Sequence, residues 1–196
     1  MYDVARIAER TIVLENGMKV FDGDTSRGIA VYDEVVFRSR RLDSLSYETG
    51  SSKKVNITGV TIQNAINRQA TNEFLTGDSI KLTVSIASQE LIQNARCQVR
   101  IESASLGLLG SFSSPYSNFY FDINPLEAAI ELTLENIPLL VGAYFVDVAI
   151  FGPQPAELLD NRQSIVNFRI VGPRWDVLGF GLHGTFLFEH KWNLVK

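Results

Sequence analysis

From residue 55 onward, apolar and polar side chains alternate along several short segments, and this alternation restricts the fold more than any other feature of the chain. Residues 80–86 read IKLTVSI and residues 97–101 read CQVRI. A period of two puts neighbouring side chains on opposite faces of a strand, so each segment has one apolar and one polar face. The pattern predicts half-buried β-strands at residues 54–65, 78–88, 95–104, 130–134, 143–151, 164–171 and 183–192.

Turn-forming residues separate these segments, including Asn-Pro at 124–125 and Gly-Pro at 152–153 and 172–173. Short alternating strands with such turns predict an all-β fold, an antiparallel β-sandwich of immunoglobulin-like or jelly-roll topology over residues 55–196. The inward-facing positions should form its core, namely Ile80, Leu82, Val84, Val99, Ile101, Ile130, Leu132, Leu134, Val146, Val148, Phe168 and Ile170.

Residues 1–36 follow a different pattern and predict a short α+β segment ahead of the sandwich. Asn16 and Gly17 lie between two short apolar runs and are typical of a tight β-hairpin, because both residues tolerate positive φ. Asp24 or Thr25 then caps a helix that is expected to run to about Val36.

A hairpin and a helix cannot enclose a core, so the segment is expected to be the end of a larger domain. We therefore expect Ile12, Leu14, Val20 and Phe21 to stay exposed or to be covered by another chain. Residues 37–54 are polar and contain a Gly-Ser-Ser stretch, which predicts a linker.

Composition argues against several classes of partner. The net charge is −4 and charged residues make up 20% of the chain, without the clustered Lys and Arg of a nucleic-acid-binding surface. A small basic group at residues 38–41 and 53–54 is expected to be solvated, or to contact an anionic partner or lipid surface. No apolar run approaches the length of a membrane-spanning helix, and the start of the chain lacks the pattern of a signal peptide.

The sequence offers no residues for catalysis, and we expect no cofactor and no metal. It has no phosphate-binding loop, no paired cysteines and no nucleophile motif. His183 and His190 are seven residues apart in one predicted strand, so they lie on opposite faces and cannot share a metal. The single cysteine, Cys97, is expected to be a buried packing thiol. The protein is therefore expected not to be an enzyme.

Two sets of residues are candidates for ligand binding. The first set alternates with the predicted core and should form one outward sheet face, and it consists of Gln98, Arg100, Phe145, Asp147, Asn167 and Arg169. An aromatic ring, amides and arginines suit a sugar with an anionic cap, although each residue is also compatible with an ordinary solvated position.

The second set lies in and beyond the segment SFSSPYSNFYFDIN, residues 111–124. It mixes aromatic rings with Ser and Asn, a combination that suits stacking and hydrogen bonding to a sugar, and it offers Tyr116, Asn118, Tyr120 and the later Trp175. The alternative is that these aromatic side chains simply cover one end of the sandwich.

Two parts of the chain together resemble one family. Residues 5–36, ARIAERTIVLENGMKVFDGDTSRGIAVYDEVV, resemble the last stretch of an ABC-transporter ATPase domain, with matches that include Arg10, Leu14 and Asp22 and with Glu9 where Asp is usual. Residues 55–192 contain VNITGVTIQN, FLTGDSIKLTVSIAS, NIPLLVGAYFVDVAIFG and FEHKW in that order. This order is similar to the C-terminal domain of Wzt-type ATPases, which serve ABC transporters that export O-antigen polysaccharides.

The resemblance implies a function in polysaccharide export. Members of this family bind the finished, often capped, non-reducing end of the glycan and so couple chain completion to export. The resemblance implies a cytoplasmic protein held at the inner membrane by a permease subunit, and a homodimer that exchanges a terminal strand, here His183 to Trp192. The 196 residues lack the ATP-binding and catalytic motifs, so we expect no ATP hydrolysis from them. The alternatives are a purely structural dimerisation domain of an ABC ATPase and an accessory carbohydrate module of an extracellular enzyme.

Overall fold

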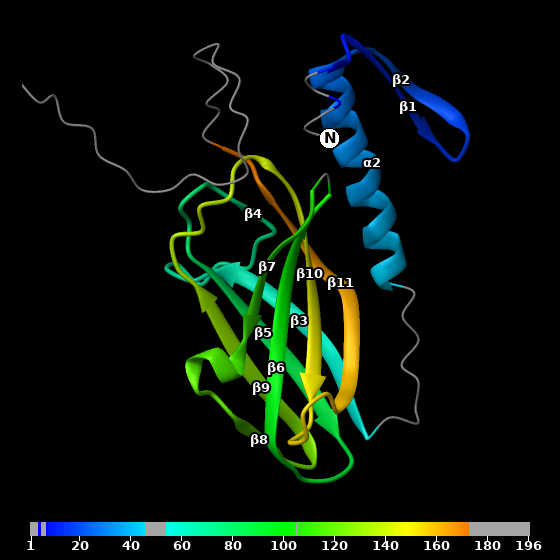
Figure 1. Cartoon of the computed structure of the whole chain (residues 1–196). Helices are drawn as coiled ribbons and strands as arrows, with labels where there is room; N and C mark the ends of the chain where they lie inside the picture. The colour runs from blue at the N-terminus through cyan, green and yellow to red at the C-terminus, as the bar shows by residue number, and fades with distance from the viewer. Residues whose placement is uncertain (1–3, 5–6, 46–53, 105, 173–196) are drawn as a thin grey trace, which may run out of the picture.

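The computed structural model describes residues 4, 7–45, 54–104 and 106–172 and contains a two-sheet sandwich with a hairpin and a helix beside it (Figure 1). The larger sheet has the strand order β4-β11-β10-β6-β7, with β8 also paired to β6, and the smaller sheet has the order β3-β5-β9. The larger sheet contains β4 (Glu73–Phe74), β6 (Ile92–Ser103), β7 (Gly107–Ser113), β8 (Phe121–Ile123), β10 (Gly142–Phe151) and β11 (Leu158–Ile170). The smaller sheet contains β3 (Val55–Asn64), β5 (Ile80–Ser88) and β9 (Leu126–Leu134).

The predicted all-β sandwich is confirmed, and its topology is immunoglobulin-like. The neighbouring strands in both sheets are antiparallel except for the short β4, which runs parallel to β11. The short β4 joins the large sheet between the small-sheet strands β3 and β5; the chain then crosses to the large sheet between β5 and β6 and returns for β9 before completing the large sheet. The small sheet therefore contains two early strands and one later strand, and the large sheet contains the other strands of the sandwich.

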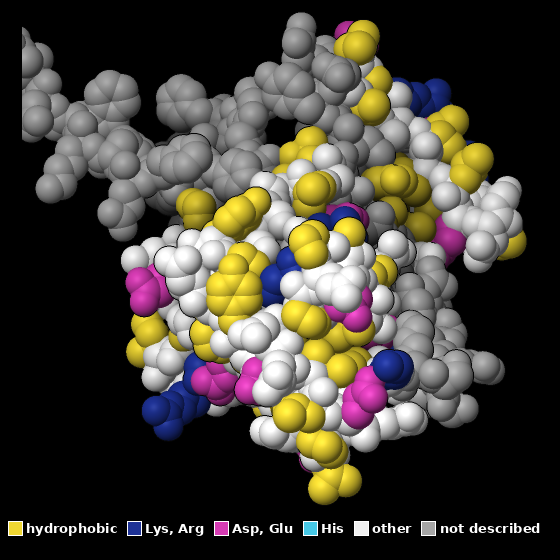
Figure 2. Space-filling model, turned by 60° about the horizontal axis from the view of Figure 1, so that its bottom comes forward, with side chains coloured by type: hydrophobic (Ala, Val, Ile, Leu, Met, Phe, Trp, Pro, Cys, Tyr) yellow, Lys and Arg dark blue, Asp and Glu magenta, His cyan; other side chains and the backbone are white. Residues whose placement is uncertain are grey.

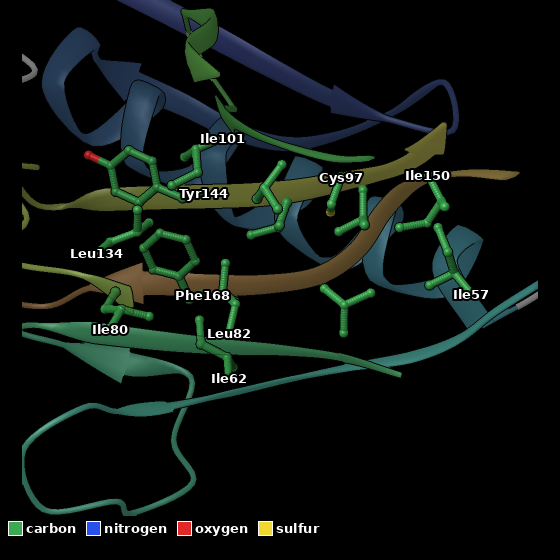
Figure 3. Packing of buried hydrophobic residues seen from close by; sticks show 14 of the residues in the cluster. Ile57, Ile62, Ile80, Leu82, Cys97, Ile101, Leu134, Tyr144, Ile150 and Phe168 are labelled. Carbon is green, nitrogen blue, oxygen red and sulfur yellow. The ribbon is translucent and has the colours of Figure 1, made fainter. Parts of the chain in front are cut away.

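The core lies between the two sheets and follows the predicted alternation (Figure 3). In β5 the apolar residues from Ile80 to Ile86 are buried and the residues between them are partly exposed. Tyr144 and Phe168 stack at a centroid distance of 5.3 Å between neighbouring strands. Ten of the twelve predicted core residues are buried, whereas Ile130 and Leu132 are only partly buried because they lie on β9, an edge strand.

The two long sides of the sandwich differ. On one side β11 packs against β3, and the buried Asp160 carboxylate accepts a hydrogen bond from the backbone N–H of Ile57 at 2.8 Å. Arg162 pairs with the same carboxylate at 3.1 Å, so these buried polar groups close this side. On the other side lie β7 and β9, the last strands of their sheets, and each pairs with one described strand only.

The N-terminal segment forms the predicted hairpin and helix. Strands β1 (Arg10–Glu15) and β2 (Met18–Asp24) meet at Asn16 and Gly17, whose φ angles of 51° and 79° fit the tight turn. The Asp24 carboxylate accepts a hydrogen bond from the backbone N–H of Arg27 and so caps helix α2. As expected, Ile12, Leu14 and Val20 are exposed, whereas Phe21 is half-buried.

Helix α2 is longer than the sequence predicts. It spans Thr25–Leu45, so residues 37–45 of the expected linker are helical. The reason is tertiary packing: Phe37, placed one residue beyond the predicted end, is buried against Phe145 of the large sheet. Among the described residues, no helix is long and apolar enough to cross a membrane.

Candidate functional site

The six residues of the first predicted set do lie on the face opposite the core. They come from β6, β10 and β11, with Arg100 opposite Asp147 and Phe145 opposite Asn167. The inward neighbours of these residues, such as Val99 and Val146, belong to the core. The predicted strand phases are therefore correct, but the surroundings of this face are not what the sequence predicts.

Helix α2 covers part of this face. Phe145 is fully buried, with its ring centroid 6.0 Å from that of Phe37. The Arg169 guanidinium lies 4.2 Å from the Phe37 centroid and forms an ion pair with Glu34 of the same helix. Asn167 is buried as well. These three sheet residues are thus less open than the alternation predicts, because helix α2 packs on Phe145 and Arg169 and lies beside β11 (Figure 1). That this set binds a glycan stays a prediction.

Asp147 and Arg100 bind each other. The Arg100 guanidinium donates to one Asp147 carboxylate oxygen at 2.9 Å, and the other oxygen accepts the backbone N–H of Ser164 at 2.7 Å. Ser164 has a φ of 49° at an irregularity in the β10–β11 pairing. Asp147 therefore stabilises a bulge, and both of its oxygens have protein partners. Gln98, the sixth member of the set, donates to the Ser111 hydroxyl at 3.0 Å.

A groove opens along the other side of the sandwich, between β7 and β9. It consists of two adjoining hollows of about 600 and 530 Å³ that share Phe112, Thr133 and Leu134. Between β7 and β8 lies the short 3-10 helix η1 (Ser114–Ser117), which forms part of the rim. We name this feature the β7–β9 groove. Its two long walls are the strands that end their sheets on this side, β7 in the large sheet and β9 in the small one.

The floor and the rim of the β7–β9 groove differ in chemistry. Buried Val84 and Val99, one from each sheet, and the thiol of Cys97 form the floor. The lining also includes Ser111, Ser113, Ser114, Ser117 and Thr133 of β7, η1 and β9. Ser111, Ser113 and Thr133 pair with Arg100, Gln98 and Lys81, so their side chains leave the strands on the outer faces of the sheets. The Ser114 hydroxyl accepts the backbone N–H of Cys97. The end of the molecule that comes forward in Figure 2 shows hydrophobic side chains among polar surface with scattered Lys, Arg, Asp and Glu. An apolar floor with a few polar groups at the rim is typical of small-ligand sites.

The second predicted set is only partly brought to the groove. Tyr116 lines it with 87% of the residue exposed. Asn118 follows η1 in a left-handed conformation, with a φ of 52°, and Tyr120 is half exposed; neither lines the groove. Trp175 lies outside the described residues.

Cys97 is the buried thiol that the sequence predicts. Burial raises its pKa to about 12, so the thiol is protonated at neutral pH. Since the thiolate is the nucleophilic form, this site does not provide an activated cysteine. Among the described residues, no cluster of three or more His, Cys, Asp or Glu is arranged to hold a metal ion.

Sequence reasoning missed the residues that shape the groove. The alternation predicts no strand at the Gly-rich and Ser-rich β7, although Phe112 there lines the groove. Ile130 and Leu132 were assigned to a closed core, and nothing in the alternation of β9 distinguishes an edge strand from a central one.

The family model and a similar solved structure identify the same domain family. The family model of the Wzt C-terminal domain matches residues 46–184. Among solved structures, the chain is similar to the crystal structure of the C-terminal domain of wzt, with 11% identity, a TM-score of 0.62, and coverage of 74% of this chain and 86% of that one. Comparison with the curated proteins gives no match.

Weaker likenesses involve much larger proteins. A β-glucuronidase of glycoside hydrolase family 2 aligns at 12% identity and a TM-score of 0.44, over 60% of this chain and 13% of that one. Bacteroides uniformis β-glucuronidase 2 aligns at 10% identity and a TM-score of 0.41, over 56% of this chain and 14% of that one. These scores carry no argument about the present fold or function. The family-model match over residues 46–184, in contrast, shows that the chain belongs to the Wzt C-terminal domain family.

Proposed function

We propose that the sandwich binds a polysaccharide at its non-reducing end and that this binding couples completion of the glycan to its export by an ABC transporter. Membership of the Wzt C-terminal domain family supports the general role. The observation that carries the site assignment is Tyr116, an aromatic ring exposed at the mouth of an apolar groove. An aromatic face packs on the C–H face of a sugar while nearby hydroxyls bond to its hydroxyl groups.

The β7–β9 groove is a better candidate than the outward sheet face. The exposed ring of Tyr116 lines its hollow, whereas helix α2 packs on Phe145 and Arg169, and Asn167 is buried. The strand edges offer unpaired backbone N–H and C=O groups, because β7 and β9 each have one described neighbour. A glycan in the groove could use these groups and the Tyr116 ring without displacing the helix.

The test compares two tyrosines of the same loop. Calorimetric or NMR titration with the polysaccharide of the producing organism should show saturable binding to the intact chain. Tyr116→Ala should weaken this binding by about tenfold or more, since truncating an exposed aromatic anchor removes its stacking contact. Tyr120→Ala is the matched control, because Tyr120 is half exposed but does not line the groove.

Three outcomes of this titration separate the candidates. If Tyr116→Ala loses glycan binding and Tyr120→Ala binds like the wild-type protein, the result supports the β7–β9 groove as the binding site. Equal binding by both variants, with loss in Gln98→Ala, would place the glycan on the outward face instead. A complete absence of saturable binding would leave a purely structural dimerisation domain as the function.

The remaining parts of the proposal concern partners and location. We propose that residues 1–36 are the end of an ABC ATPase domain, whose transmembrane permease partner holds the protein at the cytoplasmic face of the inner membrane. The hairpin supports this assignment, because Arg10 and Asp22, both positions of the resemblance, pair across its strands at 2.8 Å. Co-purification of the full-length subunit with its permease from membranes tests this proposal.

A further inference from the structure

Helix α2 meets the sandwich through a contact that is separate from the main core, beside β11 (Figure 1). We propose that this contact is a reversible latch. When docked, as in the structure, α2 covers part of the outer face of the large sheet, and when released it uncovers Phe145 and lets the hairpin and the helix move as one unit. The latch goes beyond the proposed function, because it holds whichever surface of the sandwich binds a ligand.

The hairpin and the helix form one unit. The Thr25 hydroxyl at the start of α2 donates to the backbone carbonyl of Ala8 at 2.7 Å, and it accepts a hydrogen bond from the Thr11 hydroxyl at 3.0 Å. A Cβ on Gly28 would lie 2.8 Å from the Thr11 side chain, so the helix and the hairpin are in close contact there. Movement of the helix relative to the sandwich therefore takes the hairpin with it.

The apolar part of the contact with the sandwich is small. Phe37 and the partly buried Val36 of the helix pack against Ala143 and Phe145 of β10 and against Ala104. The main core is a different cluster and lies between the two sheets. The sandwich therefore keeps its core when the helix leaves, and the cost of release is mainly the exposure of two aromatic rings to water.

An ion pair across the contact can be exchanged at little cost. Glu34 pairs with Arg169 of β11, and the two side chains are 45% and 31% exposed, so water can replace the pairing. Within the unit, Arg38 lies 3.9 Å from Glu34 and 3.7 Å from Glu15 of the hairpin. Glu34 therefore has a cationic neighbour in the docked and in the released state.

Asp33 opposes docking. It lies four residues before Phe37, which puts both side chains on the same face of the helix. The Oδ1 atom of Asp33 is buried and has no hydrogen-bond partner among the described residues. Burial raises the pKa of this carboxyl to about 6, so near pH 7 the docked helix holds a desolvated charge that release returns to water.

The ionisable groups around Asp33 do not neutralise its charge. They are Glu34 and Arg38 on the helix, Glu15 on β1, Lys19 and Asp22 on β2, Glu102 on β6, Tyr144 on β10 and Arg169 on β11. Burial and the Asp33 charge raise the pKa of Tyr144, so its hydroxyl stays neutral, and it donates to the Leu140 carbonyl. Arg38 and Arg169 pair with Glu34. In the described part of the chain, Asp33 thus has no ion-pair partner.

Double electron–electron resonance on the intact chain can detect both states. Spin labels are attached at Met18→Cys in the hairpin and Ile66→Cys in the sandwich, which replace exposed residues. The native Cys97 is buried and its pKa is raised to about 12, so it does not compete for the label. We expect one main distance from the docked state and a minor population at other distances from the released state.

Charge variants test the contact itself. Glu34→Arg places two cations side by side and should raise the released-to-docked ratio at least about fivefold, and adding Arg169→Glu should reverse most of that rise. Arg27→Glu is the control, a charge reversal at an exposed position of the same helix, and it should leave the ratio unchanged.

Asp33→Asn tests the group that opposes docking. Near pH 7 it should lower the released-to-docked ratio about tenfold or more, because the amide has no charge to desolvate. The wild-type ratio should rise between pH 4.5 and 7, since the docked state binds the proton more tightly, and the ratio of the variant should not. One unchanged distance in every variant at both pH values would show a rigid anchor and overturn the inference. An equal shift in Arg27→Glu would also overturn it, because the shift would then report loss of the helix and not of the contact.

Discussion

At the scale of single residues, Asp147 shows how a polar side chain inside a strand can be structural. It is buried, and its two oxygens bind the Arg100 guanidinium and the Ser164 backbone N–H. From the sequence alone, a carboxylate at this position was equally compatible with a solvated position and with a ligand contact. Its partners come from two different strands and could not be identified before the strands were paired.

Removal of this carboxylate should cost stability. Asp147→Ala leaves the Ser164 N–H and the Arg100 guanidinium without their partner, and we expect the free energy of unfolding to fall by roughly 1–3 kcal/mol. Urea denaturation followed by circular dichroism measures the change. Gln98→Ala, on the same face, is the control and should change stability by less than about 0.5 kcal/mol. An unchanged free energy of unfolding in Asp147→Ala would mean that the contacts of Asp147 with Arg100 and Ser164 make no net contribution to stability.

At the scale of elements, helix α2 joins the hairpin to the sandwich. Gly28 permits close contact with the hairpin, since a Cβ there would lie 2.8 Å from the Thr11 side chain. Further along, Phe37 packs on Phe145, and Glu34 pairs with Arg169. One helix therefore contacts both parts of the chain, which makes it a physical connection between the proposed ATPase end and the binding domain.

Truncating the central aromatic residue of this contact should release the helix without unfolding the sandwich. Phe37→Ala removes the contact to Phe145, which belongs to a small cluster separate from the main core. We expect faster amide hydrogen exchange in α2 and in the β10 residues beneath it, while the main core keeps its protection. Val20→Ala, an apolar truncation at an exposed hairpin position, should leave α2 protected. An unchanged rate of amide hydrogen exchange in α2 of Phe37→Ala would contradict the prediction that the Phe37 ring holds the helix on the sandwich.

The same helix carries a pH-sensitive carboxyl group. Burial raises the pKa of Asp33 from 3.8 to about 6, and its Oδ1 atom is buried without a hydrogen-bond partner. The folded state therefore binds more protons than the unfolded state between these values, so stability should fall as pH rises from about 4 to 6.

Asp33→Asn should flatten that part of the pH profile and raise stability at neutral pH, because the amide has nearly the same shape and no charge to desolvate. Denaturation midpoints at pH 4.5 and 7 for both proteins check the prediction. A wild-type and a variant protein with parallel pH profiles would show that the carboxyl group does not titrate in this range.

At the scale of the whole molecule, the sheets leave edges for association. Strand β3 ends the small sheet on the side away from the β7–β9 groove and pairs only with β5 among the described strands. β11 packs against part of β3, and the Ile57 N–H is bound to Asp160, so a strand from a second copy could pair only with the remainder of this edge. The strand expected for exchange, His183 to Trp192, and the Gly179-Phe180-Gly181 stretch before it lie outside the described residues.

We therefore predict a dimer in solution. Multi-angle light scattering at micromolar concentration should return twice the chain mass of 21.9 kDa. Removal of residues 183–196 should shift the protein to the monomer if the exchanged strand holds the dimer together. A mass of 21.9 kDa for the intact chain would exclude the exchange.

The sequence by itself determined the strongly alternating strands, their faces and the family. Period-two alternation in β5 and β6 depends only on which side of the backbone each side chain leaves, so the core from Ile80 to Ile86 could be predicted without any tertiary contact. The Asn16-Gly17 turn and the Asp24 cap were equally predictable, because both depend on backbone preferences a few residues long.

The tertiary structure alone decided which outward residues remain accessible and where the sandwich stays open. Alternation assigned Phe145 correctly to the outer face, but only packing brings Phe37 over it from more than a hundred residues away. Alternation likewise assigned Ile130 and Leu132 to the inner face, but only the strand order makes β9 an edge and leaves them beside a groove. Burial and strand order depend on contacts between distant segments, and local periodicity contains no information about either.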